Sequence, residues 1–289
     1  MAILSSLLAE RTTLSFEFFP PKNEAGADDL LETVHELDQL NPAFVSVTYG
    51  AGGTTRERTR DVVRRIIQET SVDTIPHLTC IGHSRSEMSE ILDHYSTDKV
   101  GTILALRGDP PRDQPQYDRS GDDFHFARDL VPFIKKHPHP FEIGVAGFPE
   151  GHPATQNRLE EMDYFKEKVD TGADYICTQL FFDNHDFLDY RDRCAIAGIN
   201  LPIVAGIMPI TTLSGMKRMA ELAAGSRFPA KLLRALSRTS GDPQSIRQAG
   251  IDYAIAQCQE LIEEGVSGLH LYTLNKSKAT REIAQALAF

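Results

Sequence analysis

Short runs of β-branched and aromatic residues alternate along this chain with longer runs in which apolar residues recur every three or four positions. The first pattern is typical of strands and the second of amphipathic helices. Between residues 25 and 40, Leu30, Leu31, Val34 and Leu37 fall at helical spacing. The eight predicted strands are Thr13–Phe19, Phe44–Gly50, Thr74–Cys80, Thr102–Asp109, Glu142–Pro149, Tyr175–Phe182, Pro202–Pro209 and Gly268–Leu274.

Helical patterns fill the segments between these strands. Gly172 and Gly198 stand where helix C-caps are expected. The predicted helices are Ala25–Leu40, Thr54–Thr70, Arg85–Tyr95, Asp122–Lys136, Arg158–Thr171, His185–Ala197 and Thr212–Ala224, and then Pro229–Arg238 and Pro243–Glu264 before the last strand.

The alternation of strands and helices predicts a parallel sheet joined by βαβ crossovers. Eight such units favour an α/β fold of the (β/α)8 TIM barrel type, with extra helices before the last strand, over an open doubly wound sheet. No G-x-G-x-x-G follows a predicted strand, so the usual support for a dinucleotide-binding Rossmann domain is absent. We expect residues 1–289 to form a single catalytic barrel domain.

Composition and charge narrow the function classes. The net charge of −11 argues against a nucleic-acid partner, which needs a basic face. The cysteines, at 80, 177, 194 and 258, form no C-x-x-C pair and suit a reducing compartment. The N-terminus lacks the basic region of a signal peptide, and no run approaches the length of a membrane span. A cytoplasmic protein is therefore expected.

Polar side chains gather toward the carboxyl ends of the predicted strands, where TIM barrels carry their active sites. In FEFFP, residues 16–20, strand alternation separates Glu17 from Phe16 and Phe18. The same rule puts His270 on the face of Tyr272. The predicted pocket combines Glu17, Thr48, His77, Arg107, Asp109, Gln179 and Tyr272 with His152, which follows the fifth strand.

Each of these residues also has a structural interpretation. His77 could be a hydrogen-bonded core residue, and Gln179 could cap a neighbouring backbone group. Glu17 could pair with Arg107, which could instead pair with Asp109. An ionised carboxylate in an apolar run is costly unless it is paired or used. The position of all these groups at one end of the strands favours a site.

Other chemistries have weaker support. Glu17, His77, Asp109 and His152 could together hold a metal, but no H-E-x-x-H spacing is present and no metal is expected. No G-x-S-x-G elbow supplies a nucleophilic serine. The run YGAGGTT, residues 49–55, could bind an anion at a helix N-terminus, or could be a tight turn with an N-cap at Thr54.

A set of motifs resembles the methylenetetrahydrofolate reductase family and covers nearly the whole chain in the family's order. The motifs are SFEFFPPK (15–22), FVSVTYGAGG (44–53), PHLTC (76–80), ALRGDPP (105–111), FPEGHP (148–153), KVDTGADYICTQLFFD (168–183), GIMPI (206–210) and LYTLNK (271–276). The resemblance implies a barrel that carries FAD and reduces 5,10-methylenetetrahydrofolate to 5-methyltetrahydrofolate with NAD(P)H. It also implies ping-pong transfer through the flavin, a role in methionine synthesis and a homo-oligomer.

The resemblance assigns roles by position. Glu17 matches the general acid, which protonates the leaving nitrogen of the folate ring; a carboxyl group in apolar surroundings can retain its proton near neutral pH. Asp109 matches a residue that tunes the flavin and contacts the folate, and Gln179, Tyr272 and Lys276 match folate-binding positions. The FAD positions are Thr48, His77, Leu106, Arg107, Gly108, Asp109, Phe126, Ala127, Phe148, His152, Glu161 and Lys168.

Some positions depart from the family pattern. Phe148 replaces a frequent Tyr, Glu161 replaces an Asp, and Lys276 replaces an Arg that could bind a carboxylate in bidentate fashion. Leu213 stands where some bacterial members stack a Phe on NADH, so the choice between NADH and NADPH stays open. Longer eukaryotic members add a regulatory domain, for which no room is expected here.

Two other functions use the same residues. A barrel lyase or aldolase could use Glu17 and His77 for acid–base chemistry without a redox step. A non-catalytic flavin- or folate-binding protein would need only the pocket. Bound flavin and its reoxidation by the folate separate these three hypotheses.

Overall fold

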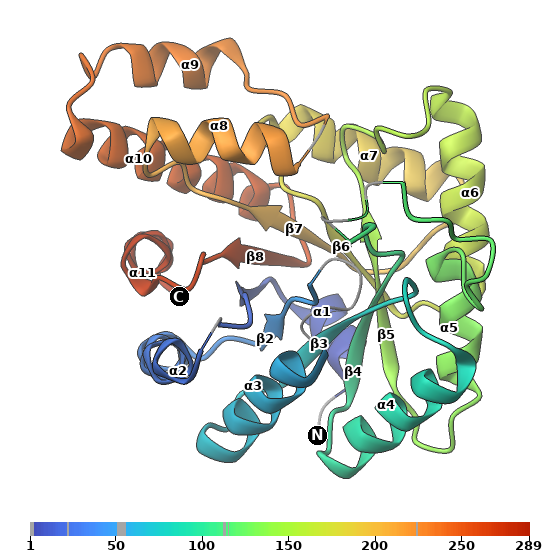
Figure 1. Ribbon diagram of the computed structural model, residues 1–289. Helices are drawn as coiled ribbons and strands as arrows, with labels where there is room; N and C mark the ends of the chain where they lie inside the picture. The colour runs from blue at the N-terminus through green and yellow to red at the C-terminus, as the bar shows by residue number, and fades with distance from the viewer. Residues whose placement is uncertain (1–2, 22, 51–55, 112–113, 115, 224) are drawn as a thin grey trace.

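The fold is a closed barrel of eight parallel strands in the order β1 to β8. The computed structural model describes residues 3–21, 23–50, 56–111, 114, 116–223 and 225–289. Helices surround the barrel (Figure 1). Each strand pairs with its neighbours along the chain, and β1 also pairs with β8, where Ser15 lies opposite His270 and Glu17 opposite Tyr272. The predicted (β/α)8 barrel is confirmed.

The strands begin almost where predicted and end earlier. They are β1 Thr13–Phe18, β2 Phe44–Val47, β3 Thr74–Thr79, β4 Thr102–Leu106, β5 Glu142–Gly147, β6 Tyr175–Thr178, β7 Ile203–Ile207 and β8 Gly268–Tyr272. Every predicted strand was too long at its carboxyl end. The chain leaves the sheet there to form the loops of the site, although its composition stays strand-like.

The helices within the described residues are α1 Leu4–Glu10, α2 Glu24–Asp38, α3 Arg56–Glu69, α4 Arg85–Thr97, α5 Ala127–Lys135, α6 Arg158–Asp170, α7 Asn184–Ile196, α8 Leu213–Leu222, α9 Ala230–Ser237, α10 Pro243–Glu263 and α11 Ser277–Ala286. The helix predicted from Asp122 begins only at Ala127. Asp129 Oδ2 accepts the backbone N–H groups of His125 and Phe126, at 3.0 and 2.9 Å, and so fixes this start. The proposed N-cap Thr54, like residues 51–53, lies outside the described residues.

Two clusters of buried apolar side chains stabilise the barrel, one outside and one inside the ring of strands. Outward-facing residues such as Phe16 and Phe18 pack in one cluster with helical residues such as Leu30 and Val34. A second cluster fills the barrel interior and consists of Leu4, Leu8, Phe44, Ile75, Leu104, Tyr175, Cys177 and Val204. Gly144 makes room for the Tyr175 ring, because a Cβ at this glycine would lie 2.3 Å from Tyr175 Cζ.

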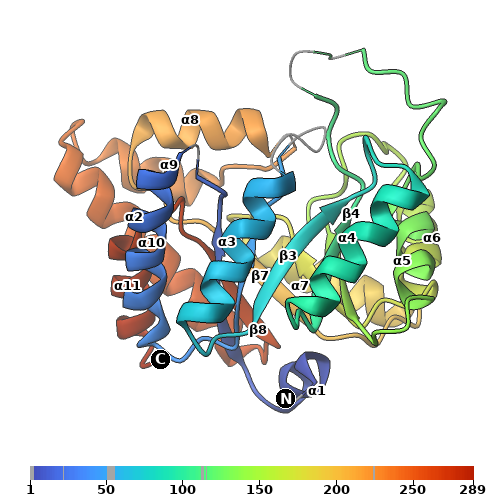
Figure 2. The same cartoon turned by 60° about the horizontal axis from the view of Figure 1, so that its bottom comes forward.

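Helix α1, which the sequence analysis did not predict, closes one end of the barrel. Its Leu4 and Leu8 complete the interior cluster. The carboxylate of Glu142 accepts the Leu4 N–H at 2.6 Å and the Ser5 N–H at 3.0 Å, which satisfies the start of the helix. Figure 2 shows α1 at the end of the barrel opposite α8 and the loop after β4.

The predicted extra helices before the last strand are confirmed. Helices α8, α9 and α10 lie together at one side of the barrel (Figure 1). Their apolar residues, including Met219, Leu232 and Ile246, form a separate cluster with Leu180 and Phe182 from the segment after β6. This packing attaches the three helices to the carboxyl end of the barrel.

Candidate functional site

A cavity of about 790 Å³ lies beside the carboxyl ends of β3 to β6 and is lined by many of the predicted site residues. It is formed by the loops after these strands and by the first turns of α5 and α6. The predicted residues that line it are Leu106, Arg107, Gly108, Asp109, Phe126, Ala127, Phe148, His152, Glu161, Lys168 and Gln179. Separate stretches of sequence therefore converge on one cavity.

Gly108 determines how the loop after β4 enters this cavity. Its φ of +81° is in the left-handed region, which side chains disfavour. A Cβ there would lie 2.7 Å from Thr79 Cβ and 2.8 Å from Ile81 Cγ2. Arg107 and Asp109 were expected on one face of the fourth strand, but β4 ends at Leu106 and both lie in this turn. In the part of the chain that the structure describes, no salt bridge joins Arg107 to Asp109 or to Glu17.

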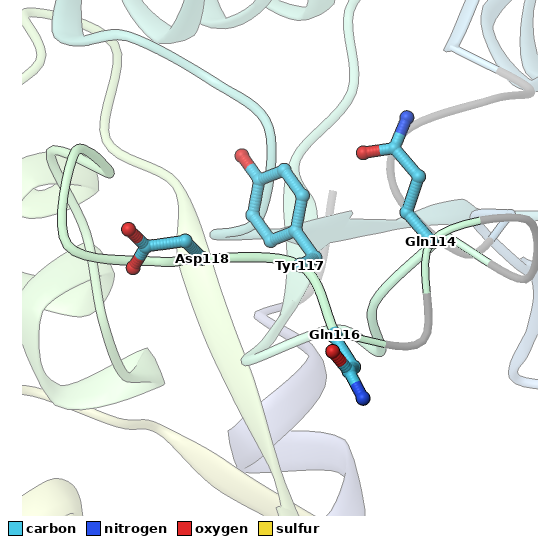
Figure 3. A pocket seen from close by; sticks show the side chains of 4 residues that line it. All are labelled: Gln114, Gln116, Tyr117 and Asp118. Atoms are coloured by element: carbon cyan, nitrogen blue, oxygen red, sulfur yellow. The ribbon is translucent and has the colours of Figure 1, made fainter.

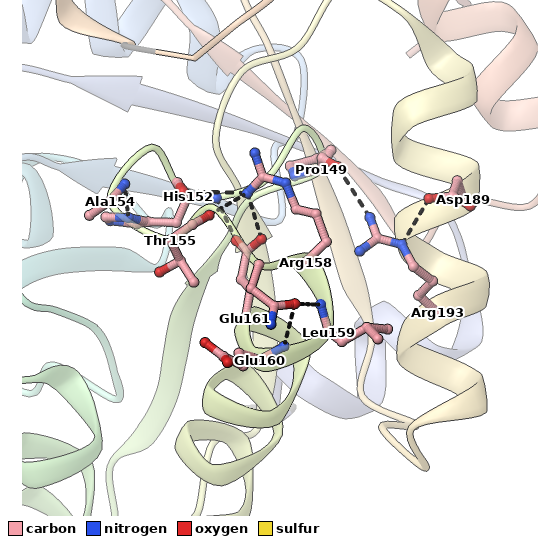
Figure 4. Close-up of polar contacts among 11 residues, drawn as sticks. Pro149, His152, Ala154, Thr155, Arg158, Leu159, Glu160, Glu161, Asp189 and Arg193 are labelled. Carbon is pink, nitrogen blue, oxygen red and sulfur yellow. Dashed lines mark hydrogen bonds and ion pairs between the residues drawn. The ribbon is translucent and has the colours of Figure 1, made fainter.

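A polar network supports the loop that carries His152 (Figure 4). Glu161 Oε1 accepts the His152 N–H at 2.5 Å, and its Oε2 lies 2.8 Å from Arg158 Nη1. The guanidinium of Arg158 occupies the space where a Cβ of Gly151 would be, 1.8 Å from its Nη1. Glu161 thus shapes the cavity by fixing this loop. One of its carboxylate oxygens contacts the His152 N–H and the other contacts Arg158.

His152 presents a neutral ring to the cavity. The Ala154 N–H donates to its Nδ1 at 3.1 Å, which leaves Nε2 as the protonated nitrogen. Burial, assisted by the nearby Arg107, lowers the pKa of His152 below its ordinary value. The ring also meets Phe148 edge to face, with centroids 4.7 Å apart. It can therefore donate one hydrogen bond to a ligand.

Cationic groups make the cavity suitable for an anion. The Lys168 ammonium donates to the Ala146 carbonyl at 2.6 Å and lies 4.7 Å from the centre of the Phe165 ring. Burial lowers the pKa of Lys168 to about 8, against the raising effect of Glu161. Arg107 and the first turn of α5, at Ala127, also face this space. Backbone N–H groups at a helix start attract negative charge.

Glu17 lies inside the barrel, 7% exposed, with its carboxyl group between two imidazoles. Its Oε2 lies 3.5 Å from His77 Nε2 and 3.6 Å from His270 Nε2. The Glu17 carbonyl accepts the hydroxyl and the N–H of Thr273, at 2.6 and 3.2 Å. Phe16 and Phe18 pack on the opposite face of the strand. Two histidines therefore flank the carboxyl group, where apolar surroundings were expected.

Burial keeps two neighbours of Glu17, His77 and Tyr272, neutral at physiological pH. Burial lowers the pKa of His77 to about 4, despite the opposing effect of Glu17. Burial also raises the pKa of Tyr272, whose hydroxyl donates to the Thr178 carbonyl at 3.0 Å. Gly206 permits this contact, because a Cβ there would lie 2.9 Å from the Tyr272 hydroxyl oxygen. These two neighbours of the Glu17 carboxyl group therefore carry no charge near neutral pH.

The remaining predicted residues are Thr48, His77, Gln179 and Lys276. Thr48 and His77 do not line the cavity, although His77 shares a strand face with Thr79, which does. The Gln179 side chain accepts the neighbouring Leu180 N–H at 2.9 Å, as the structural alternative anticipated. Lys276 is the N-cap residue of α11. Neither Lys276 nor Glu17 is part of the cavity wall.

Some polar residues at the site were not assigned a role from the sequence. Ser15 and Ser46 both contact the ring of His270. Strand alternation placed His270 beside Tyr272, but nothing in the sequence indicated the two serines as its partners. That signal comes only from the pairing of β1 with β8 and β2.

A second, open hollow of about 420 Å³ lies in the loop between β4 and α5 and is lined by Gln114, Gln116, Tyr117 and Asp118 (Figure 3). None of the predicted site residues lines it. Among the residues that can be placed, no group of three or more His, Cys, Asp or Glu side chains could hold a metal ion. Over the same residues, no helix has the length and apolar character needed to cross a membrane.

Comparison with known proteins gives consistent matches over the chain. The family model described as methylenetetrahydrofolate reductase matches residues 3–288. The 5,10-methylenetetrahydrofolate reductase of Escherichia coli K12 is 35% identical over 287 residues, which are 98% of this chain and 94% of that protein. Methylenetetrahydrofolate reductase (NADH) 1 of Arabidopsis thaliana is 38% identical over 279 residues, 93% of this chain but 47% of the plant protein. The chain thus spans about half the length of its plant and yeast relatives.

Solved structures share the fold at low sequence identity. A protein from Clostridium thermocellum, described as binding two copies of 5-methyl-5,6,7,8-tetrahydrofolic acid, has a TM-score of 0.66 at 12% identity and covers 99% of both chains. Dihydropteroate synthase from Xanthomonas albilineans has a TM-score of 0.52 at 13% identity, with 96% of this chain and 92% of that chain covered. These two matches support the barrel fold.

Proposed function

The chain belongs to the methylenetetrahydrofolate reductase family, and on this premise we propose that it reduces 5,10-methylenetetrahydrofolate to 5-methyltetrahydrofolate. The hydride comes from NAD(P)H through FAD, with the two substrates bound in turn. The product supplies methyl groups for methionine synthesis. The observation that carries the proposal is the convergence of a cationic, aromatic-lined cavity and a buried carboxyl group at one end of the barrel.

The chemistry of the cavity fits FAD. Arg107, Lys168 and the start of α5 suit the diphosphate, and His152 offers one N–H donor. Phe126, whose side chain is 47% exposed, and Phe148 offer apolar ring surfaces. The left-handed backbone at Gly108 brings the loop after β4 to the cavity wall. When bound, the flavin supplies the acceptance and return of hydride.

The residues of this chain provide binding and acid catalysis. Glu17 gives a proton to the folate ring nitrogen that leaves when the five-membered ring opens, and this makes the one-carbon group a better hydride acceptor. Gln179 and Asp109, both on the cavity wall, bind the pterin ring. Asp109 also tunes the flavin electrostatically. Tyr272 and Lys276 contact the folate from the eighth strand and the loop after it.

The test is the visible spectrum of the purified protein under anaerobic conditions. We expect a flavin spectrum that NADH or NADPH bleaches and that methylenetetrahydrofolate restores, with 5-methyltetrahydrofolate as the product. Parallel titrations with the two nucleotides measure the preference. Protein that stays colourless after reconstitution with FAD would exclude the flavin enzyme and leave the lyase hypothesis. Reduced flavin that the folate never reoxidises would leave only a binding function. Light scattering after size exclusion measures the expected homo-oligomer.

A further inference from the structure

The backbone pairing of β1 with β8 stops beside Glu17. Glu17 lies opposite Tyr272, and the Glu17 carbonyl accepts the Thr273 N–H at 3.2 Å, as in a regular parallel ladder. The next bond of such a ladder would join the Phe19 N–H to the Thr273 carbonyl. That carbonyl instead accepts the Lys276 N–H at 3.1 Å, because the chain turns after β8. The turn therefore diverts from Phe19 the backbone partner that a longer strand would supply.

The side chain of Asn275 takes the place of this backbone partner. Its Oδ1 accepts the Phe19 N–H at 2.8 Å, and its Nδ2 donates to the Phe19 carbonyl at 2.8 Å. We refer to these two hydrogen bonds as the Asn275 clamp. An N–H needs an acceptor and a carbonyl needs a donor, so the two contacts fix the orientation of the amide. Pro20 and Pro21 follow and have no N–H, so the clamp holds the last residue before them that can donate to β8.

The backbone of Asn275 also acts on Glu17, through Thr273. The Asn275 N–H donates to Thr273 Oγ1 at 3.0 Å, and this hydroxyl donates to the Glu17 carbonyl at 2.6 Å. Because the hydroxyl oxygen accepts from Asn275, its own proton is directed toward Glu17. Thr273 is buried, which shields these bonds from water. One turn, residues 273–275, thus holds the backbone of β1 at Glu17 and again at Phe19.

This turn has a backbone conformation that its residues disfavour. Leu274 and Asn275 have φ angles of +52° and +58°, in the left-handed region. Asparagine tolerates this region, whereas leucine there is uncommon. The Leu274 side chain is 46% exposed, so burial of its apolar surface does not account for the conformation. Strained backbone persists where surrounding contacts determine it, and it is concentrated at functional sites. The hydrogen bonds from Asn275 to Phe19 and Thr273 are contacts of this kind.

We propose that Asn275 is a positioning residue for folate reduction: its clamp holds the exit of β1, and with it the Glu17 side chain, against the turn that carries Lys276. This role rests on the proposed functions of Glu17 as the acid and of Lys276 as a folate contact. Small displacements of reacting groups reduce rates strongly. Asn275 acts through Phe19 and Thr273 and is not among the residues that line the cavity described above. Flavin reduction by NAD(P)H should therefore not depend on it.

Asn275→Ala and Asn41→Ala form a matched pair of variants. Asn41 has a similar φ, +48°, at the opposite end of the barrel between α2 and β2, and within the described residues its side chain makes no hydrogen bond. Both variants place alanine in left-handed backbone, but only Asn275→Ala removes contacts to β1. It should slow flavin reoxidation at saturating folate about 10–100-fold in stopped-flow absorbance and leave flavin reduction unchanged. Asn41→Ala should leave both half-reactions unchanged. Equal slowing of the two half-reactions in Asn275→Ala would overturn the proposal.

Asn275→Asp should make the clamp depend on pH. An ionised carboxylate at this position still accepts the Phe19 N–H but turns a second acceptor toward the Phe19 carbonyl, whereas a protonated carboxyl donates its O–H there. The repulsion between the two acceptors raises the pKa of the new carboxyl above the ordinary value of about 3.9. The reoxidation rate of Asn275→Asp, divided by that of the unmodified enzyme, should therefore rise as pH falls from about 8 to about 5. The same ratio for Asn275→Ala should stay level, and parallel ratios for the two variants would contradict the role of the amide.

Amide hydrogen exchange of the holoenzyme gives a reading that does not depend on folate reduction. The Phe19 N–H should exchange slowly in the unmodified protein and in Asn41→Ala, and about tenfold faster in Asn275→Ala. Exchange that Asn275→Ala does not accelerate would refute the clamp. If the unmodified enzyme does not reduce the folate, the proposed function fails and this positioning role fails with it, whereas the exchange rates still decide whether Asn275 holds β1.

Discussion

Gly108→Ala should destabilise the protein by about 2–5 kcal/mol and weaken flavin binding. The left-handed backbone at φ +81° costs a residue with a side chain roughly 1–2 kcal/mol. The new Cβ would lie 2.7 Å from Thr79 Cβ and 2.8 Å from Ile81 Cγ2, and both neighbours are buried. Overpacking of this kind costs about 1–3 kcal/mol. The turn can relieve the strain only by moving Arg107 and Asp109.

Gly101→Ala is the matched control at the other end of β4. No atom lies within 4 Å of a Cβ built there, so this variant should be as stable as the unmodified protein or slightly more stable. Urea unfolding of the apoprotein measures the free energy, and quenching of flavin fluorescence measures the affinity. A Gly108→Ala protein within about 0.5 kcal/mol of the Gly101→Ala protein would refute the strain argument.

Three further results are expected. Glu17→Gln should retain flavin reduction by NAD(P)H and slow flavin reoxidation by the folate about 10²–10⁴-fold in stopped-flow absorbance; an equal loss in both half-reactions would make Glu17 structural. Because burial lowers the pKa of Lys168 to about 8, its charge is present below that pH and lost above it, so flavin affinity should fall as pH rises through about 8. Lys168→Met should flatten that profile, and an unchanged slope would contradict the assignment. Glu142→Gln should weaken the attachment of α1 and lower the free energy of unfolding by about 1 kcal/mol, measured in urea, whereas Glu142→Asp tests the reach of the carboxylate.

The barrel was predictable because each strand and helix carries its own periodic signal. The ends of the strands were not, since the residues after them keep the apolar composition of a strand while lining a cavity. Strand β4 ends at Leu106 because Gly108 turns the chain. The alternation of polar and apolar residues gives no information about the φ angle of a glycine. At Asp122 the helical pattern was real, but the capping contacts of Asp129 place the start at Ala127.

Helix α1 escaped prediction for a different reason. Its seven residues, which include the buried Leu4 and Leu8, are too short a segment to establish a helical period. The helix is stabilised by the packing of Leu4 and Leu8 in the barrel interior and by the carboxylate of Glu142, which is 138 residues away from Leu4 in the sequence. In the site, parity and resemblance located Glu17, but the imidazoles that face it come from β3 and β8. Such neighbours depend on the closed register and not on any local pattern.

Because the barrel closes between its first and last strands, the surroundings of Glu17 combine the two ends of the barrel sequence. Glu17 is near the beginning of the chain, whereas His270, Tyr272 and Thr273 belong to its last strand and the residue after it. Ser15 and His270 are 255 positions apart, so their contact forms only after every intervening unit has emerged from the ribosome. The residues that line the cavity all precede β8 in the sequence, so they leave the ribosome before the last side chains that surround Glu17. Addition of β8 is therefore the step that completes the surroundings of Glu17.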